Sequence, residues 1–436
     1  MSALTARVLE DFASATRGPP ASSSHAAHHR AAAIGALETA GLPSSRDENW
    51  KYANLRSLER VRFVPAPAAA ALPSAAELPP PLPGIARFVF IDGRFAPAHS
   101  AAPAAAAGAV TLLSEAADGL RAAADRRPDE RAADERFALL NQAFATDGLA
   151  IELGKANATP LQLEVLFVAS AEAQSGASYP RLEVRLAPGA RLTLIERHVS
   201  AGGAASFVTG AAHVTLERGA RLEHYRLQEL NSRSTCFDTL SAELAEDAGY
   251  RLHAISTGAQ SARTTLATRL NGERADLALA IAALGDRQQV QDAYAVVEHA
   301  APNARTVQTF RGIAAGRSRV AFNGKIIVAP GAHGTDSRQS LRGLLAGPEA
   351  EIDVRPQLEI YTDDVRCSHG ATAGKLDENM LFYLLSRGLE RDTAQRLLKW
   401  AFLEDVIAQI ELRPLRRQIE ERLAGQLRDE ALRELL

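Results

Sequence analysis

The sequence predicts a mainly β protein whose strands stack as a solenoid between helical segments at the two ends of the chain. Three observations predict it: a strand–turn–strand unit repeated after 30 residues, a helical spacing of apolar residues after position 376, and a helix-forming stretch over the first 60 residues. The 436 residues suffice for two or three domains of about 150 residues each. We expect an N-terminal helical region with Ala/Pro-rich linkers over 1–150, a β core over 151–375 and a C-terminal helical domain over 376–436.

The repeat is clearest where two segments are compared: RLEVRLAPGARLTLIER at 181–197 and AHVTLERGARLEHYRLQ at 212–228. Each contains a strand, a Gly-Ala turn and a second strand. Within the first strand, Leu182, Val184 and Leu186 alternate with charged residues, which indicates one buried and one solvated face. That alternation suits a solenoid wall or a β-sandwich, and the fixed spacing of the turns favours the solenoid.

The N-terminal region combines helix formers with two Ala/Pro-rich stretches at 64–84 and 96–108, which we interpret as surface linkers. Between them, RFVFIDGRF at 87–95 predicts a short hairpin, because an Asp-Gly pair favours a tight turn between strands. Trp50, within RDENWKYANL, is expected to anchor its segment to the body of the protein.

Capping signals divide the C-terminal block into helices. Asp377 is placed to cap a helix over ENMLFYLLSR, and Gly388 to end it. Asp392, with a glutamine three residues later, predicts a capping box at the start of a second helix. Pro414 marks a break before the last segment.

The second helix carries an apolar stripe that is wider than about 60 residues normally bury alone. We therefore expect it to pack on the β core or on a partner protein. Its candidate contact residues, at successive i+4 positions, are Leu398, Phe402, Val406 and Ile410.

Composition excludes several classes of function. A net charge of −3 argues against a nucleic-acid binder, and no apolar run reaches the roughly 18 residues of a membrane span. Glu10 and Asp11 lie where a signal peptide would be apolar, so we expect a cytoplasmic protein. There is no GxxxxGK[ST] phosphate loop, so ATP hydrolysis by this chain is not expected. Two cysteines cannot supply the roughly four ligands of an iron–sulfur cluster.

The pair Cys367 and His369 is the main candidate site. Spaced i, i+2 on a strand, the two side chains would share one face about 6.6 Å apart, and thiolate and imidazole both bind zinc or iron. Two ligands leave such a site incomplete. A buried structural cysteine beside a hydrogen-bonded histidine is the commoner explanation of this pattern. A catalytic Cys–His pair fits poorly, because a base must come within about 3 Å of the sulfur.

Three motifs, RDENWKYANL, FNGKIIVAPGAHGTDSRQS (322–340) and PQLEIYTDDVRCSHGATAGKLDENMLFYLLSRGL (356–389), resemble the SufB/SufD family of iron–sulfur cluster assembly proteins. They occur in the family's order, and the CSHGA form at 367–371 is similar to the SufD branch. The resemblance implies a right-handed parallel β-helix core between helical ends. It also implies pairing with a SufB-like subunit through the β-helix and docking of a SufC-like ABC ATPase on the C-terminal domain.

For the site, the resemblance implies that His369 lies at the SufB interface and helps to hold a nascent, transient cluster with a SufB cysteine. Cys367 matches a neighbouring family cysteine. Reduced flavin is associated with the family's complex, and no motif here locates a site for it. Pairing of two copies of the chain in the absence of a SufB-like subunit stays open. The resemblance implies a non-catalytic scaffold; the alternative, a β-helix enzyme such as a polysaccharide lyase or acyltransferase, lacks an export signal and a six-residue repeat.

Overall fold

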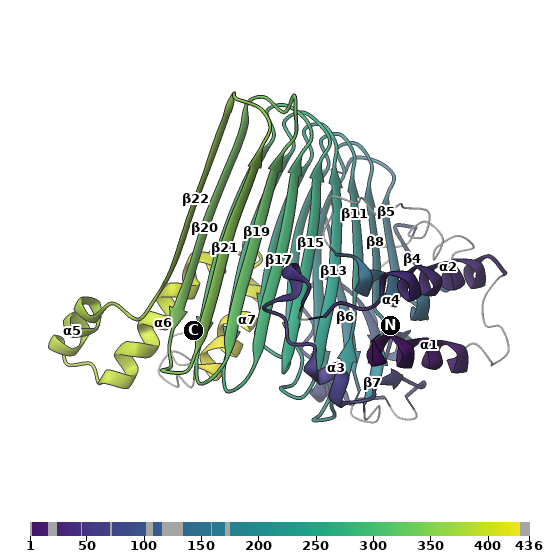
Figure 1. Ribbon diagram of the computed structural model, residues 1–436, viewed down its shortest axis with the longest axis horizontal. Helices are drawn as coiled ribbons and strands as arrows, with labels where there is room; N and C mark the ends of the chain where they lie inside the picture. The colour runs from purple at the N-terminus through teal and green to yellow at the C-terminus, as the bar shows by residue number, and fades with distance from the viewer. Residues whose placement is uncertain are drawn as a thin grey trace.

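The computed structural model describes residues 2–15, 24–44, 46–69, 72–101, 108–115, 134–157, 159–170 and 175–427. These residues form a parallel β-solenoid of about seven turns, with helices at its N-terminal and C-terminal ends (Figure 1). The predicted stacked-strand architecture is therefore confirmed. Each turn of the solenoid contributes one long strand to each of two facing sheets, so the chain also has the two walls that a sandwich would have.

The larger sheet, sheet A, has 12 strands, and sheet B has 10. The main path of sheet A runs through β4 (Val110–Leu112), β5 (Leu149–Leu153), β8 (Arg181–Leu186), β11 (Ala211–Leu216), β13 (Thr235–Leu244), β15 (Ser261–Leu270), β17 (Val290–His299), β19 (Arg319–Val328) and β21 (Glu351–Ile360). Three short strands join it: β1 (Val64–Pro65), β7 (Gly176–Ser178) and β10 (Ser206–Val208). Sheet B runs through β3 (Arg94–Phe95), β2 (Ala86–Ile91), β6 (Leu161–Ala169), β9 (Arg191–Ser200), β12 (Arg221–Glu229), β14 (Gly249–Ser256), β16 (Asp276–Gly285), β18 (Arg305–Ala314), β20 (Thr335–Leu345) and β22 (Val365–Gly374).

The turns keep successive strands in register. Gly189 and Gly219 adopt positive φ angles of 71° and 67°, a conformation that glycine enters without steric cost. The Gly189 N–H donates to the Arg218 carbonyl of the next turn at 2.9 Å, and the Gly219 N–H donates to Glu246 in the same way. The turns therefore stack on one another, as the sequence repeat predicts.

The main hydrophobic core fills the space between the two sheets. Alternate residues point inward, so that Leu182, Val184 and Leu186 on β8 are each no more than 2% exposed. The charged residue Arg181 on the same strand is also buried, because helix α4 (Arg136–Phe144) and neighbouring turns cover that part of the outer face. Burial is thus one-sided along most of the strand but two-sided at its start.

The N-terminal segment covers part of the outer face of sheet A. Trp50 is 1% exposed and packs on Phe137 and Phe237, so the expected aromatic anchor is confirmed. The predicted hairpin is also confirmed, since β2 and β3 pair antiparallel about Asp92–Gly93. The elements before the core include α1 (Ala3–Ala15), α2 (Ser24–Ala40), η1 (Glu48–Trp50), α3 (Arg56–Arg60), η2 (Ala75–Glu77), η3 (Pro97–His99) and α4 (Arg136–Phe144).

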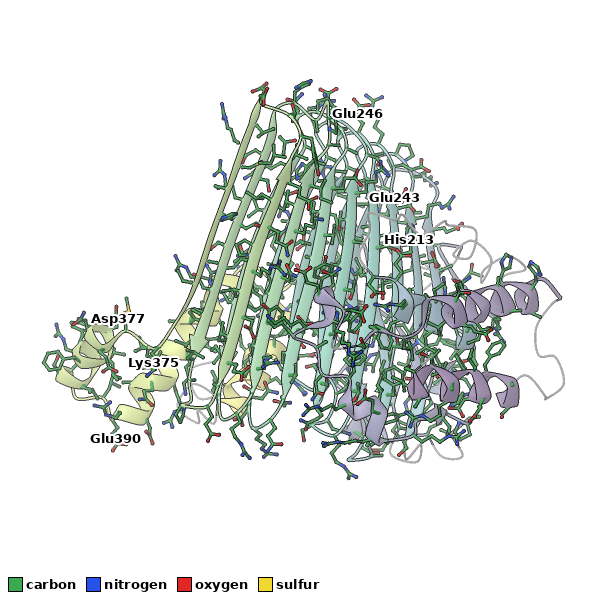
Figure 2. The ribbon with its side chains drawn as sticks, in the orientation of Figure 1. His213, Glu243, Glu246, Lys375, Asp377 and Glu390 are labelled. Carbon is green, nitrogen blue, oxygen red and sulfur yellow. The ribbon has the colours of Figure 1, made fainter. Side chains whose placement is uncertain are left out.

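The C-terminal helices are α5 (Glu378–Ser386), α6 (Arg391–Ile407) and α7 (Arg413–Gln426). The Asp377 side chain accepts from the N–H groups of the first turn of α5, and Gly388 follows that helix at φ 90°, as predicted. The prediction of a capping box at Asp392 is wrong. Helix α6 begins at Arg391 with Glu390 as its N-cap, so Asp392 lies inside the first turn. Figure 2 labels Asp377 and Glu390 where α5 and α6 begin.

Helices α6 and α7 turn back over the outer face of sheet B, whereas α5 projects beyond the last strands (Figure 1). The C-terminal helices therefore cover the outer face of sheet B and leave the last turn of the solenoid uncovered. None of the helices in the described part of the chain has both the length and the hydropathy needed to cross a lipid bilayer.

Candidate functional site at the last turn of the solenoid

Cys367 and His369 both lie on β22, the terminal strand of sheet B. They stand in register with Ser337 and Gln339 of β20. The Gln339 side chain bonds the Gly324 carbonyl of sheet A, so this set of residues points into the space between the sheets. In-register neighbours on parallel strands share a face, and Cys367 and His369 therefore point the same way, as their i, i+2 spacing predicts.

The two residues differ in exposure because nothing in the described chain covers the last turn. Cys367 is half-buried against Ile326, Val328 and Leu358, whereas His369 is exposed. Within the described residues, β22 pairs only with β20 and β21 only with β19, so each sheet ends in an open edge. Unpaired backbone groups along such an edge are a template for a further strand.

Burial raises the pKa of the Cys367 thiol; the Asp336 carboxylate adds to the effect and the Ser337 backbone N–H opposes it. The sulfur therefore holds its proton more strongly than a free cysteine does. Because metals bind the thiolate form of cysteine, any metal bound at Cys367 would have to displace this proton.

No group of three or more His, Cys, Asp or Glu side chains with metal-binding geometry occurs among the described residues. Cys367 and His369 thus have no third ligand from the rest of the described chain. A thiolate and an imidazole are suitable ligands for the iron of an iron–sulfur cluster, but a site with four ligands requires groups from outside the described residues.

The predicted apolar stripe of the C-terminal block packs largely against the chain itself. Val406 and Ile410 are 0% and 2% exposed, in a cluster with outward-facing residues of sheet B such as Tyr225 and Ile313. Leu398 and Phe402 are half-buried. The sequence left open whether this stripe packs on the β core or on a partner protein. Val406 and Ile410 pack on the β core and therefore expose no surface to a partner.

Exposed apolar side chains in this block lie instead on α5. Met380, Phe382 and Tyr383 are 58%, 72% and 56% exposed. Adjacent large apolar side chains at this exposure are typical of interaction surfaces. Sequence periodicity could not single them out, because a buried and a partner-bound apolar face have the same spacing.

A network of charged side chains inside the solenoid was missed by the sequence analysis. Arg226 on sheet B pairs with Asp238 on sheet A, and Glu196 bonds His198, His224 and Arg226. All of these side chains are buried. The sequence contains a signal for this network, because Glu196 and Arg226 occupy inward positions that are in register on successive turns.

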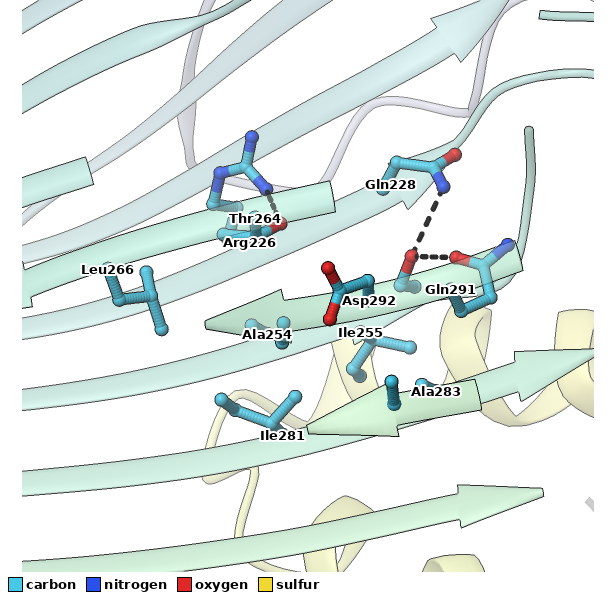
Figure 3. Close-up of a pocket in the computed structure, with 13 residues that line it drawn as sticks. Arg226, Gln228, Ala254, Ile255, Thr264, Leu266, Ile281, Ala283, Gln291 and Asp292 are labelled. Carbon is cyan, nitrogen blue, oxygen red and sulfur yellow. Dashed lines mark hydrogen bonds between the residues drawn. The ribbon is translucent and has the colours of Figure 1, made fainter. Parts of the chain in front are cut away.

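Beside this network lies a cavity of about 20 Å³, shown in Figure 3. Three of its polar side chains are paired with one another, since Gln228 donates to Ser256 at 3.1 Å and Ser256 donates to Gln291 at 2.5 Å. This volume holds about one water molecule. The network and its cavity are therefore part of the packed core.

Comparison with known proteins identifies the family of the chain. Residues 167–402 match the family model described as the SufBD core domain of the SUF system for FeS cluster assembly. The chain is 33% identical to the iron–sulfur cluster assembly protein SufD of Escherichia coli (strain K12), over 89% of this chain and 90% of that one. It is 28% identical to an iron–sulfur cluster assembly SufBD family protein of Synechocystis, over 90% of this chain and 89% of the relative.

The chain belongs to the SufB/SufD family of iron–sulfur cluster assembly proteins. Within that family it is a SufD-type protein, as the CSHGA motif predicts.

Proposed function

We propose that this chain is a scaffold subunit that contributes His369, with Cys367 beside it, to a nascent iron–sulfur cluster completed by a SufB-like subunit. One observation carries the proposal: an incomplete pair of metal-binding side chains lies on the last strand of a solenoid whose edge is open. The cluster is the cargo of this reaction, and two side chains in reach of a partner's ligands are what a shared assembly site requires.

The uncovered last turn of the solenoid also supports pairing with a SufB-like subunit. Ile352, Val354 and Leu358 on β21 face the interior but are only half-buried. Solenoids need a cap over their terminal repeats, and a second solenoid that extends both sheets supplies one. A SufB-like subunit docked there brings its own side chains next to Cys367 and His369.

ATP hydrolysis belongs, in this proposal, to a SufC-like subunit that docks on the C-terminal helices. The exposed apolar residues of α5 support this docking, because the helix itself projects beyond the last strands of the solenoid. Closure of two ATPase subunits, one on each scaffold chain, would strain the junction of the two solenoids and open the site for iron and sulfide.

The test is a His369→Ala variant in the co-expressed complex, purified by a tag on this chain and reconstituted anaerobically with iron and sulfide. We expect the complex to be recovered with its cluster absorbance greatly reduced. His333→Ala is the matched control, because His333 is an exposed histidine at the turn that precedes β20. Full absorbance in the His369→Ala complex would refute the role of this histidine.

The alternative of a β-helix enzyme finds less support. A polysaccharide lyase binds its cation through clustered carboxylates, and the described residues contain no such cluster. The internal cavity has room for about one water molecule and not for a sugar. An open groove of about 750 Å³ on sheet B, lined in part by Glu223, Arg251 and Glu411, is large enough, but the described residues there include no group of three side chains placed to bind a cation.

A further inference from the structure

Directly behind Cys367 and His369 lies a second pair of polar side chains, Ser337 and Gln339, one strand further into the solenoid. Ser337 is 0% exposed and Gln339 is 4% exposed. The Ser337 Oγ and the Gln339 Oε1 are buried and have no hydrogen-bond partner. Buried polar atoms are nearly always paired, so an unpaired oxygen beside a candidate site needs an explanation.

The orientation of the Gln339 amide is fixed. Its Nε2 donates to the Gly324 carbonyl across the interior at 3.0 Å and to Gln308 Oε1 at 3.0 Å. A backbone carbonyl can only accept, so the atom facing it must be the nitrogen. Gln308 and His369 flank Gln339 on opposite sides, on β18 and β22. With Nε2 committed to Gly324 and Gln308, the oxygen is the amide atom that remains available to His369.

The opposite wall is shaped around this arrangement. A Cβ on Gly324 would lie 2.8 Å from Gln339 Nε2 and 2.9 Å from Gln308 Oε1, closer than real Cβ atoms approach. Because position 324 is a glycine, there is space for the side-chain amides of Gln339 and Gln308 to form their hydrogen bond.

We propose that Gln339 is a positioning residue for His369: its Oε1 accepts a hydrogen bond from one imidazole N–H and leaves the other ring nitrogen free for iron. Neighbouring strands lie about 4.8 Å apart, which is within reach of both side chains. Histidines that bind metals almost always donate their second N–H to such an acceptor, which fixes the tautomer and the ring orientation. The role toward iron rests on the function proposed above, whereas the hydrogen bond does not.

The bond can be tested by nitrogen-15 NMR of the full chain labelled at its 11 histidines, with the His369 signals assigned by their loss in His369→Ala. We expect one tautomer of His369 in the unmodified chain and a mixture of two in Gln339→Leu. Gln339→Glu should keep the single tautomer, because a carboxyl group retains the acceptor. Ser337→Ala is the matched control in the same buried layer and should also keep it.

A mixture of tautomers in the unmodified chain, or a single tautomer in Gln339→Leu, would overturn the inference. If Gln339→Leu does not fold, Gln339→Met keeps the side-chain length without an amide oxygen and carries the same expectation. In the reconstituted complex, Gln339→Leu should lower the cluster yield about ten-fold or more. An unchanged yield despite mixed tautomers would refute the positioning role. Full assembly in His369→Ala would instead refute the proposed function, and the tautomer result would still decide the contact.

Discussion

Arg226 donates from its Nε to Glu196 Oε1 over 3.2 Å, and both side chains are buried between the two sheets. Burial alone would raise the pKa of Glu196. The Arg226 guanidinium and hydrogen bonds from His198 and His224 outweigh it and hold this pKa well below its usual value. Arg226 also pairs with Asp238 of the opposite sheet. One guanidinium thus compensates two buried carboxylates and links the two walls.

We predict that Arg226→Met lowers the free energy of unfolding by about 3–5 kcal/mol, because it leaves Glu196 and Asp238 buried without a counter-charge. Urea denaturation followed by circular dichroism measures the change. The matched control is Arg274→Met, since Arg274 pairs with three exposed carboxylates at a solvated turn. Exposed ion pairs contribute little, so the control should unfold close to the unmodified chain. Equal losses in the two variants would contradict the argument from burial.

His299 gives the stability of the chain a pH dependence. Burial lowers its pKa to about 4, and its Nε2 lies 2.9 Å from Thr306 Oγ1. Between the unfolded pKa of about 6.5 and the folded value, the unfolded chain binds a proton that the folded chain does not. The free energy of unfolding therefore falls as the pH decreases through this window, by about 3 kcal/mol in total.

His299→Gln should remove this contribution and flatten the stability profile between about pH 6.5 and pH 4. Urea denaturation at half-unit pH steps measures it. His333→Gln, which removes an exposed imidazole, is the control variant. A profile for His299→Gln as steep as that of the unmodified chain would show that His299 is not the titrating group.

Trp50 fastens the N-terminal segment to the outer face of sheet A. The Arg263 guanidinium lies 4.1 Å from the centre of its ring, and its Nε1 donates to Asp134 at 2.7 Å. Trp50→Ala should cost about 3–5 kcal/mol of unfolding free energy, measured by chemical denaturation. Tyr52→Ala, a half-buried aromatic in the same segment, should cost clearly less. The reverse order would show that Trp50 does not anchor the segment.

The fold was predictable because each turn of the solenoid repeats the same local chemistry. The Gly-Ala turns and the alternation of Leu182, Val184 and Leu186 specify strands of fixed length and a buried face. Local signals at the start of α6 are ambiguous, since two acidic residues, Glu390 and Asp392, lie where the helix begins, and the structure has Glu390 as the N-cap. The charged network depends on pairs such as Glu196 and Arg226 that lie in register on neighbouring turns, a relation that local periodicity does not contain.

The candidate site was predictable in its residues but not in its position. The i, i+2 spacing of Cys367 and His369 gives a common face on a strand. Only the folded chain shows that this strand is the last one and that the helices after it cover a wall instead of the end. Gln339 could not be inferred from local sequence, because its relation to His369 comes from the register of β20 with β22.

In the function proposed above, a SufC-like ATPase subunit docks on helix α5. Phe382 is 72% exposed on α5, whereas Ile410 of the predicted stripe is 2% exposed against the solenoid. We expect Phe382→Ala to leave the melting temperature unchanged and to reduce recovery of the SufC-like subunit in a pull-down several-fold, because exposed aromatic side chains dominate binding at interfaces. Ile410→Ala should instead lower the free energy of unfolding by about 2–5 kcal/mol, because it removes a buried side chain. The two variants thus separate docking from folding. Recovery of the ATPase subunit at full yield with Phe382→Ala would exclude this face of α5 as its docking surface.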